Sequence, residues 1–124
     1  MALLPAEGPF RQVVRSGSLL FCSGVVCADV VGGESARGDI ASETRVVLSA
    51  ISDLLVEHGS SIRNVVRADV YVADVSLKPA MDSVYKEFFP TGSEPARTTV
   101  GVTGMYDDCL VEITVIAEAG AGTA

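Results

Sequence analysis

The sequence is poor in histidine and cysteine, and this shortage narrows the chemistry that it can support. It contains one histidine, His58, and three cysteines, Cys22, Cys27 and Cys109, with no paired metal-binding spacing. A structural zinc site normally has four such ligands, and a Ser-His-Asp or Cys-His nucleophile needs a well-placed histidine. We therefore expect no metal site, and we interpret the cysteines as buried thiols in a reducing compartment. Chemistry would have to use carboxylates, arginine, hydroxyls or the backbone.

The sequence also lacks clustered basic residues and long apolar runs. Nine lysines and arginines are scattered among sixteen acidic residues, which gives a net charge of −7. This balance disfavours nucleic acid as a partner, because phosphate binding needs local cationic density. The longest charge-free run, residues 16–28, is too short to span a membrane, and the first ten residues lack the basic start of a signal peptide. We expect a soluble, cytoplasmic protein without membrane contact.

The chain nevertheless has enough apolar content for a core. Its 124 residues, 48% apolar and 20% charged, fit one compact domain spanning residues 1–124. A domain of this size buries only about two thirds of the surface that its unfolded chain exposes. Together with a mean hydropathy of +0.40, this favours further burial against copies of the same chain.

Periodicity divides the chain into seven elements. The expected strands are residues 10–15, 19–23, 65–75, 97–102 and 109–118, and the expected helices are residues 40–58 and 78–89. Residues 25–39 are rich in glycine and are predicted to form a loop or an irregular hairpin that turns at Gly32 and Gly33. Residues 120–124 are expected to be frayed.

The first helix has the clearest signals. Asp39 is placed to cap its start, and Gly59 follows it as a residue that readily adopts a left-handed conformation. Apolar positions recur at three- and four-residue steps, with Glu43 among the polar residues between them. In the following strand, Val66 belongs to an alternating set with Ala68, Val70 and Val72 that we expect to be buried.

The element order predicts an α+β fold with a single mixed sheet and two helices on one face. The other face would then stay bare. Because its residues are apolar, we expect that face to meet neighbouring subunits.

Two charged residues stand in the otherwise apolar final strands. Arg97 begins "RTTVGV", and Glu112 lies within "CLVEITVIA". Their strands are consecutive, and we expect them to be antiparallel neighbours that bring the two charges together. Opposite charges in apolar strands are costly unless they pair or serve a site. The pattern leaves two alternatives, a buried or interfacial salt bridge and a ligand site.

Several motifs resemble those of the YjgF/RidA family of small trimeric reactive-intermediate deaminases. They include "GPF" at residues 8–10, "CSG" at residues 22–24, "VYKEFFP", "PARTTVGV" and "LVEITVIA". They cover nearly the whole chain in the same order as in the family. The resemblance implies a homotrimer of chorismate-mutase-like architecture with clefts between subunits.

The resemblance also implies a reaction, the hydrolysis of enamines and imines such as 2-aminoacrylate to 2-oxo acids and ammonia. Arg97 matches the family's substrate-binding arginine, whose planar fork would hold the substrate carboxylate. Glu112 matches the glutamate that orients water near the imine carbon. No metal or organic cofactor is implied, because an iminium carbon is already electrophilic.

Further residues are assigned to the substrate site by the same resemblance, with two departures. Phe10 stands where many active members have tyrosine, and Thr99 stands where many have cysteine. Gly24 would line the cleft through its backbone. Phe88 or Phe89 would form its apolar wall, although the pattern alone favours a core position for both because they end an amphipathic helix.

Two other functions stay open from the sequence. The chain could be a non-catalytic trimer that binds a carboxylate ligand for regulation, with Arg97 as the anchor and Glu112 mainly structural. It could also act on a different, pathway-specific imine, since the apolar Phe10 suits a bulkier substrate. A nuclease role finds little support in the acidic charge and the single histidine.

Overall fold

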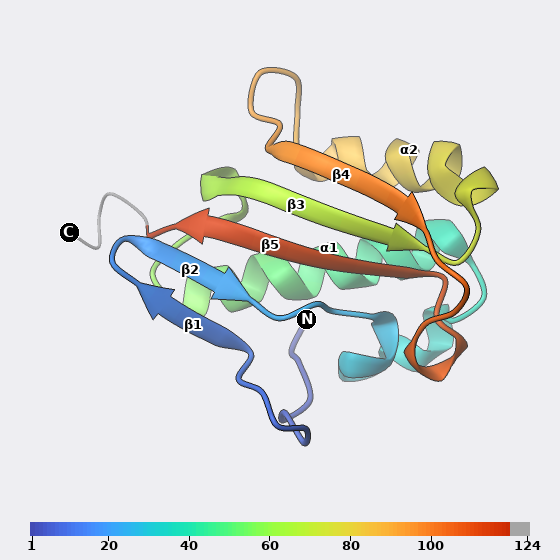
Figure 1. Ribbon diagram of the computed structural model, residues 1–124, viewed down its shortest axis with the longest axis horizontal. Helices are drawn as coiled ribbons and strands as arrows, with labels where there is room; N and C mark the ends of the chain where they lie inside the picture. Colours follow the sequence, from blue (N-terminus) through green and yellow to red (C-terminus); the bar gives the residue numbers. More distant parts are fainter. Residues whose placement is uncertain (120–124) are drawn as a thin grey trace.

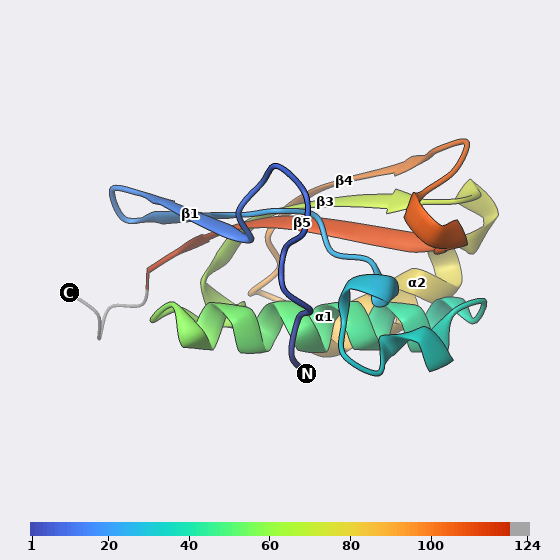
Figure 2. The same ribbon diagram turned by 90° about the horizontal axis from the view of Figure 1, so that it is seen from below.

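The computed structural model describes residues 1–119, which form a five-stranded sheet with two helices on one face (Figures 1 and 2). The strands are β1 (Val13–Ser16), β2 (Leu19–Cys22), β3 (Val65–Val72), β4 (Ala96–Gly101) and β5 (Val111–Glu118). The helices are α1 (Ile40–Glu57) and α2 (Lys78–Phe88), and five short 3₁₀ turns, η1 to η5, lie between these elements. The predicted α+β fold with both helices on one face is confirmed. The frayed end expected at 120–124 lies outside the described residues.

The strand order is β1-β2-β5-β3-β4, and this order corrects one prediction. β4 runs parallel to β3, and every other neighbouring pair is antiparallel. A parallel neighbour requires a crossover connection, which α2 supplies between β3 and β4. β5 then pairs with the free edge of β3. The prediction that β4 and β5 are neighbours is therefore wrong, because β3 lies between them.

Helix α1 begins and ends where its sequence signals place it. The Asp39 side chain accepts a hydrogen bond from the Ser42 backbone N–H at 3.0 Å, and Gly59 has a φ of +77°. The expectation for Glu43 is wrong, because its side chain is fully buried instead of exposed. Within residues 1–119, no helix has both the length and the apolar character needed to cross a membrane.

Two local predictions differ from the structure. β1 begins at Val13, so Phe10 precedes the sheet instead of lying in it. Val66 is 41% exposed, because the β3–β5 register shifts between Val65 and Arg67 and turns the side chain out of the alternating set. Residues 25–39 form an irregular loop that contains two 3₁₀ turns, η1 (Cys27–Asp29) and η2 (Gly33–Ala36), so the loop is the predicted alternative that is observed.

The core fills the space between the sheet and the helices, and the opposite face of the sheet is bare in the single chain (Figure 2). Val14, Phe21 and Val100 are large apolar residues exposed on strands β1, β2 and β4. The bare face predicted from the sequence is thus present in the structure. That copies of the chain cover it stays a prediction.

Candidate functional site

Arg97 and Glu112 lie on opposite faces of the sheet. In the strand register, Arg97 stands beside Ala68 of β3, whereas Glu112 stands beside Tyr71, three positions further along. Paired residues point to the same face, and successive residues of a strand alternate between faces. Arg97 therefore faces the helices and Glu112 faces away from them. The salt bridge that the sequence left open as an alternative does not form within one subunit.

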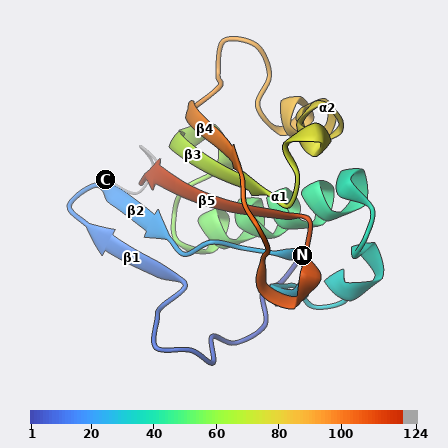
Figure 3. The same ribbon diagram turned by 45° about the vertical axis from the view of Figure 1, so that its right-hand side comes forward.

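On the helix side, Arg97 is fixed by two residues of α2, which lies beside the edge strand β4 (Figure 3). Its Nη1 donates a hydrogen bond to Asp82 Oδ1 at 2.6 Å. Its Cζ lies 4.7 Å from the centre of the Tyr85 ring, within the range of a cation–π contact. Asp82 also accepts a hydrogen bond from Lys78 Nζ at 2.7 Å. The guanidinium is therefore both paired and oriented.

A cavity of about 730 Å³ opens beside Arg97. Phe89 lines it, together with Tyr85, Asp82 and Pro95. Phe89 is nearly fully buried, and its ring centre lies 4.7 Å from that of Tyr85. Phe88 does not line the cavity and packs against the core instead. Of the two phenylalanines offered as an apolar wall, the structure places Phe89 there.

Thr99 and Tyr85 each bring an unused hydroxyl to this region. Thr99 lies two positions after Arg97 on β4, so it points to the same face. Its Oγ1 and the Tyr85 hydroxyl are buried and have no hydrogen-bond partner among residues 1–119. Burial raises the pKa of Tyr85 to about 12, despite the nearby Arg97 charge. The phenol therefore stays protonated and can donate a hydrogen bond. Thr99 does not line the cavity beside Arg97.

A second cavity, of about 590 Å³, lies beside Glu112. It brings together three residues that the sequence assigns to the site, Phe10, Gly24 and Glu112. Asp29 of η1 and Tyr106 also line it. Phe10 is 54% exposed, and its ring lies over Gly8. The apolar Phe10 ring is thus available to contact a ligand in this cavity.

Gly24 makes room for the Glu112 carboxylate. A Cβ atom at this position would lie 2.2 Å from Glu112 Oε2 and 2.9 Å from Thr114 Oγ1. Neither distance is compatible with van der Waals contact, so any side chain at position 24 would displace the carboxylate. The glycine therefore lines this cavity through its backbone, and its place in a cleft between subunits stays a prediction.

The surroundings of Glu112 disfavour its negative charge. The side chain is half-buried, and no lysine or arginine among residues 1–119 forms an ion pair with it. Burial raises the pKa of Glu112, and the charge of Asp29 raises it further. A carboxyl group with a raised pKa exchanges a proton more readily near neutral pH, which suits an acid–base role.

Sequence reasoning missed four residues that shape these cavities. Asp82 and Tyr85 stand three positions apart on α2, a spacing that places them on one side of a helix. The spacing alone does not distinguish a cavity residue from a core residue, and Tyr85 is both, because it lines the cavity and is only 6% exposed. Asp29 and Tyr106 lie in short 3₁₀ turns, for which the sequence carries no periodic signal.

Comparison with known proteins gives one family. The family model described as Endoribonuclease L-PSP matches residues 2–119. The chain is 38% identical over 110 residues to a RutC family protein of Pyrococcus horikoshii, covering 89% of this chain and 86% of that protein. It is 33% identical over 115 residues to the 2-iminobutanoate/2-iminopropanoate deaminase of Bos taurus, covering 93% of this chain and 83% of that protein.

A solved structure shares the fold. The E. coli protein TdcF, solved with bound serine, superposes with a TM-score of 0.80 at 27% identity. The superposition covers 93% of this chain and 91% of TdcF. The sheet order and the helix arrangement described above are thus found in a protein whose structure contains a small amino acid.

Proposed function

The chain belongs to the Endoribonuclease L-PSP family, also called the YjgF/RidA family, and we propose that it hydrolyses short-lived 2-imino acids and their enamine tautomers. The products would be 2-oxo acids and ammonia. The name of the bovine relative supports this reaction class. The serine bound to TdcF supports a site for a small molecule that carries a carboxylate.

The observation that carries the proposal is the separation of two complementary half-sites. Arg97 and Glu112 lie in different cavities on opposite faces of one sheet, with β3 between their strands. A small substrate cannot contact both side chains of the same subunit. Head-to-tail contacts in a ring of identical subunits would bring one cavity of each chain against the other cavity of its neighbour. We therefore propose a homotrimer with the reaction site in each cleft between subunits.

In this site the arginine would hold the substrate and the glutamate would move protons. Two guanidinium N–H groups donate to the substrate carboxylate, while Asp82 keeps the Arg97 side chain oriented. Glu112 accepts a proton from water as the oxygen bonds to the imine carbon. Delivery of this proton to nitrogen gives a carbinolamine. Glu112 then moves the hydroxyl proton to nitrogen, and the C–N bond breaks as the C=O bond forms and ammonia leaves. The chain supplies orientation and proton transfer, because the imine carbon is already electrophilic.

A coupled assay tests this function directly. An amino-acid oxidase generates imino acids from a panel of amino acids, and semicarbazide traps the imine that is not hydrolysed. We expect wild type to lower the trapped fraction. Loss of two charge-assisted hydrogen bonds should make Arg97→Ala about 100- to 10,000-fold less active in kcat/KM. We expect Glu112→Gln to lose a similar factor by removing the proton acceptor. Arg63→Ala, at an exposed position outside both cavities, is the matched control and should match wild type.

The same assay separates catalysis from regulation by ligand binding. If wild type fails to lower the trapped fraction for every amino acid, general imine hydrolysis is wrong. Binding of serine or a 2-oxo acid, measured by calorimetry and abolished by Arg97→Ala, would then identify a carboxylate-binding regulatory protein. A parallel incubation with RNA checks for the endoribonuclease activity after which the family is named, for which the net charge of −7 gives no support.

A further inference from the structure

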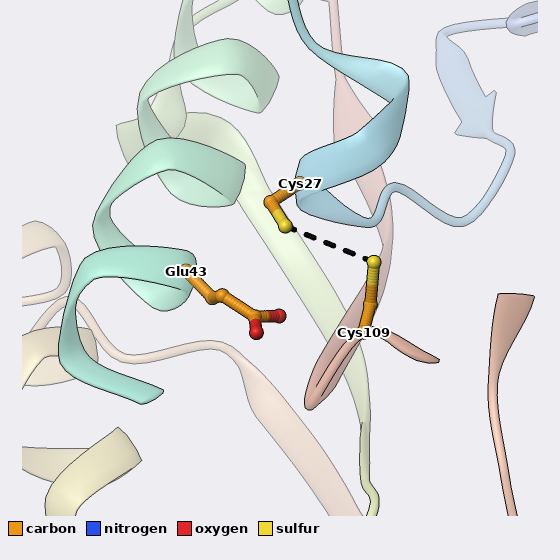
Figure 4. Close-up of side chains that lie close together, drawn as sticks. All are labelled: Cys27, Glu43 and Cys109. Atoms are coloured by element: carbon orange, nitrogen blue, oxygen red, sulfur yellow. Dashed lines mark hydrogen bonds between the residues drawn. The ribbon is translucent and has the colours of Figure 1, made fainter. Parts of the chain in front are cut away.

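In the core, the structure brings together two thiols and a carboxylate that line neither of the two cavities. The side chains are Cys27, Glu43 and Cys109, and all three are fully buried (Figure 4). Their sulfur and carboxylate atoms lie within 4.8 Å of one another, and the two Sγ atoms are 3.7 Å apart. The residues come from η1, from the first turn of α1 and from the segment before β5. Their wide separation in the chain explains why the sequence shows no metal-binding spacing.

Glu43 is the unexpected member of this group. Its carboxylate accepts hydrogen bonds from the backbone N–H groups of Gly38 and Leu110, each at 2.8 Å. None of the ion pairs formed within residues 1–119 includes it. A buried carboxylate is costly unless it is paired with a cation or coordinates a metal. The two backbone hydrogen bonds orient the carboxylate, whose oxygen atoms lie on the side of Glu43 that faces the two sulfurs (Figure 4).

We propose that Cys27, Glu43 and Cys109 bind one divalent cation of the zinc class. Two thiolates on a tetrahedral zinc ion, each about 2.3 Å from the metal, lie about 3.8 Å apart. The 3.7 Å between the two sulfurs of this chain is close to that value. Thiolate and carboxylate together suit a borderline-soft ion, whereas magnesium and calcium prefer oxygen ligands alone. A fourth coordination position is left for water.

The charges of the surrounding groups are compatible with this assignment. A cation would displace the thiol protons, as metal binding to cysteine requires. Two thiolates and a carboxylate exceed the charge of a divalent ion by one. Arg37 lies near the Cys109 sulfur and also forms an ion pair with Asp107, so its charge is shared between the remaining negative charge of the site and Asp107.

The bound ion would join three segments of the fold. η1 carries Cys27 and also Asp29, which lines the cavity of Glu112. A metal would therefore stabilise the folded chain and hold that turn in place. The site neither depends on imine hydrolysis nor supplies a step in it.

Cobalt is the probe for the test, because thiolate-to-cobalt charge transfer reports sulfur coordination. The intact chain is reduced with a phosphine, and Co²⁺ is added to the folded protein and also during refolding, since the cluster is buried. We expect one Co²⁺ per chain, displaced by Zn²⁺. Cys27→Ala and Cys109→Ala should abolish the charge-transfer band. Glu43→Gln should weaken Co²⁺ binding by at least about 10- to 100-fold. That is the loss expected when a residue that only hydrogen-bonds a metal ligand is removed, and Glu43 would be a ligand itself.

Cys22→Ala is the matched control, because Cys22 is a buried cysteine on β2 outside the cluster. It should bind Co²⁺ like wild type. The proposal is wrong if reduced wild type shows no charge-transfer band, or if the band survives in Cys27→Ala. It is equally wrong if the reduced chain binds no cobalt while air oxidation links Cys27 to Cys109, which would identify a redox pair. If the alanine variants do not fold, X-ray absorption spectroscopy of zinc-loaded wild type tests the site instead. We expect two sulfur ligands on the zinc, and a zinc ion without sulfur ligands would show that the proposal is wrong.

Discussion

The two half-sites of this protein carry opposite charges, and the surroundings stabilise one of these charges and disfavour the other. The Arg97 guanidinium is neutralised by Asp82 and lies over the Tyr85 ring. Glu112 has no cationic partner among residues 1–119, and Asp29 adds a like charge to its surroundings. One charge is therefore stabilised where it lies, and the other is disfavoured.

This difference matches two different tasks. A substrate-anchoring group must keep its charge and its orientation, and the contacts of Arg97 with α2 secure both. A proton-transfer group must change its charge during the reaction, which a raised pKa makes easier near neutral pH. The two environments would impair one another inside a single pocket. Their placement on opposite faces of the sheet allows each to form within its own subunit before assembly.

Mixing two inactive variants tests the separation of the half-sites most strongly. We expect Arg97→Ala and Glu112→Gln to be nearly inactive alone, because each lacks one half of every cleft. After the two are unfolded together and refolded, random assembly should give about a quarter of the clefts both intact halves. Imine hydrolysis in the mixture should therefore recover to about a quarter of the wild-type rate.

The control is a mixture of each variant with itself, treated in the same way, which should stay inactive. Size-exclusion chromatography with light scattering checks that the mixed species is a trimer. If the mixture remains as inactive as the separate variants although trimers form, Arg97 and Glu112 do not act in the same cleft. The function proposed from their separation would then have to be abandoned.

Adding one methyl group beside Glu112 should impair only the carboxylate half-site. In Gly24→Ala, the new Cβ would lie 2.2 Å from Glu112 Oε2, so the carboxylate must move. A displacement of about 1 Å in a reacting group can lower the rate about 100-fold, and we expect a loss of that size in kcat. KM should change little, because the arginine cavity is untouched.

Gly104→Ala is the matched control for this change, because a Cβ at Gly104 meets no atom within 4 Å. It should keep wild-type activity. Equal activity of Gly24→Ala and wild type would show that the observed position of the Glu112 carboxylate is not the reactive one.

Much of the fold follows from local signals in the sequence. The cap at Asp39, the glycine after α1 and the alternation of β3 are local, and the structure confirms the elements that they predict. Strand order is not local. The sequence places Arg97 and Glu112 on consecutive strands, but the α2 crossover takes β4 to one edge of β3 and leaves the other edge for β5.

The candidate site was predictable to about the same extent as the fold, because only some of its residues give a local signal in the sequence. Arg97 and Glu112 stand out because charges are unusual in apolar strands, and Gly24 was identified through family motifs. Asp82 gave no such signal, because an acidic residue on an amphipathic helix is ordinary, and its role depends on where α2 packs. The burial of Glu43 gives no signal in the sequence for the same reason. Periodicity identified the helix, but the backbone N–H groups that bury this carboxylate come from Gly38 and Leu110, outside it.

Removing the charge that neutralises Arg97 should have a smaller effect, on substrate binding. Partial burial raises the pKa of Asp82, but hydrogen bonds from Arg97 and Lys78 outweigh it and lower the pKa overall. Asp82→Asn keeps an acceptor and removes the charge, so the guanidinium should attract the substrate carboxylate more strongly. We expect KM to fall several-fold with little change in kcat, because Asp82 would no longer compete with the substrate carboxylate for the charge of Arg97.

Lys78→Met is the control, because it removes the other cation beside Asp82 and leaves Arg97 in place. Its KM should stay near that of wild type. A higher KM in Asp82→Asn would mean that the orienting effect of the ion pair on Arg97 outweighs its competition with the substrate carboxylate. The stability change should be at most about 1 kcal/mol, since the pair is partly exposed.

The smallest expected effect is a shift in pH dependence at the carboxylate half-site. Burial, followed by the Asp29 charge, raises the pKa of Glu112 above its ordinary value of 4.5. The stability that this group contributes is fully present below its unfolded pKa and is lost as pH rises through the folded pKa. Activity has the opposite sign, because the proton acceptor works only when ionised. The acid limb of kcat/KM should therefore lie above pH 4.5 and move to lower pH in Asp29→Asn.

Asn at position 29 can still accept the hydrogen bond that Asp29 takes from the Val26 N–H at 3.1 Å, so the turn should remain folded. Added salt should shrink the shift, because the interaction between Asp29 and Glu112 is screened. Glu57→Gln removes an exposed charge at the end of α1 and should leave the acid limb in place. If Asp29→Asn does not shift the acid limb of kcat/KM, that limb reports the ionisation of a group other than Glu112. The contrast between a stabilised arginine and a disfavoured glutamate would then not explain the division of catalytic roles.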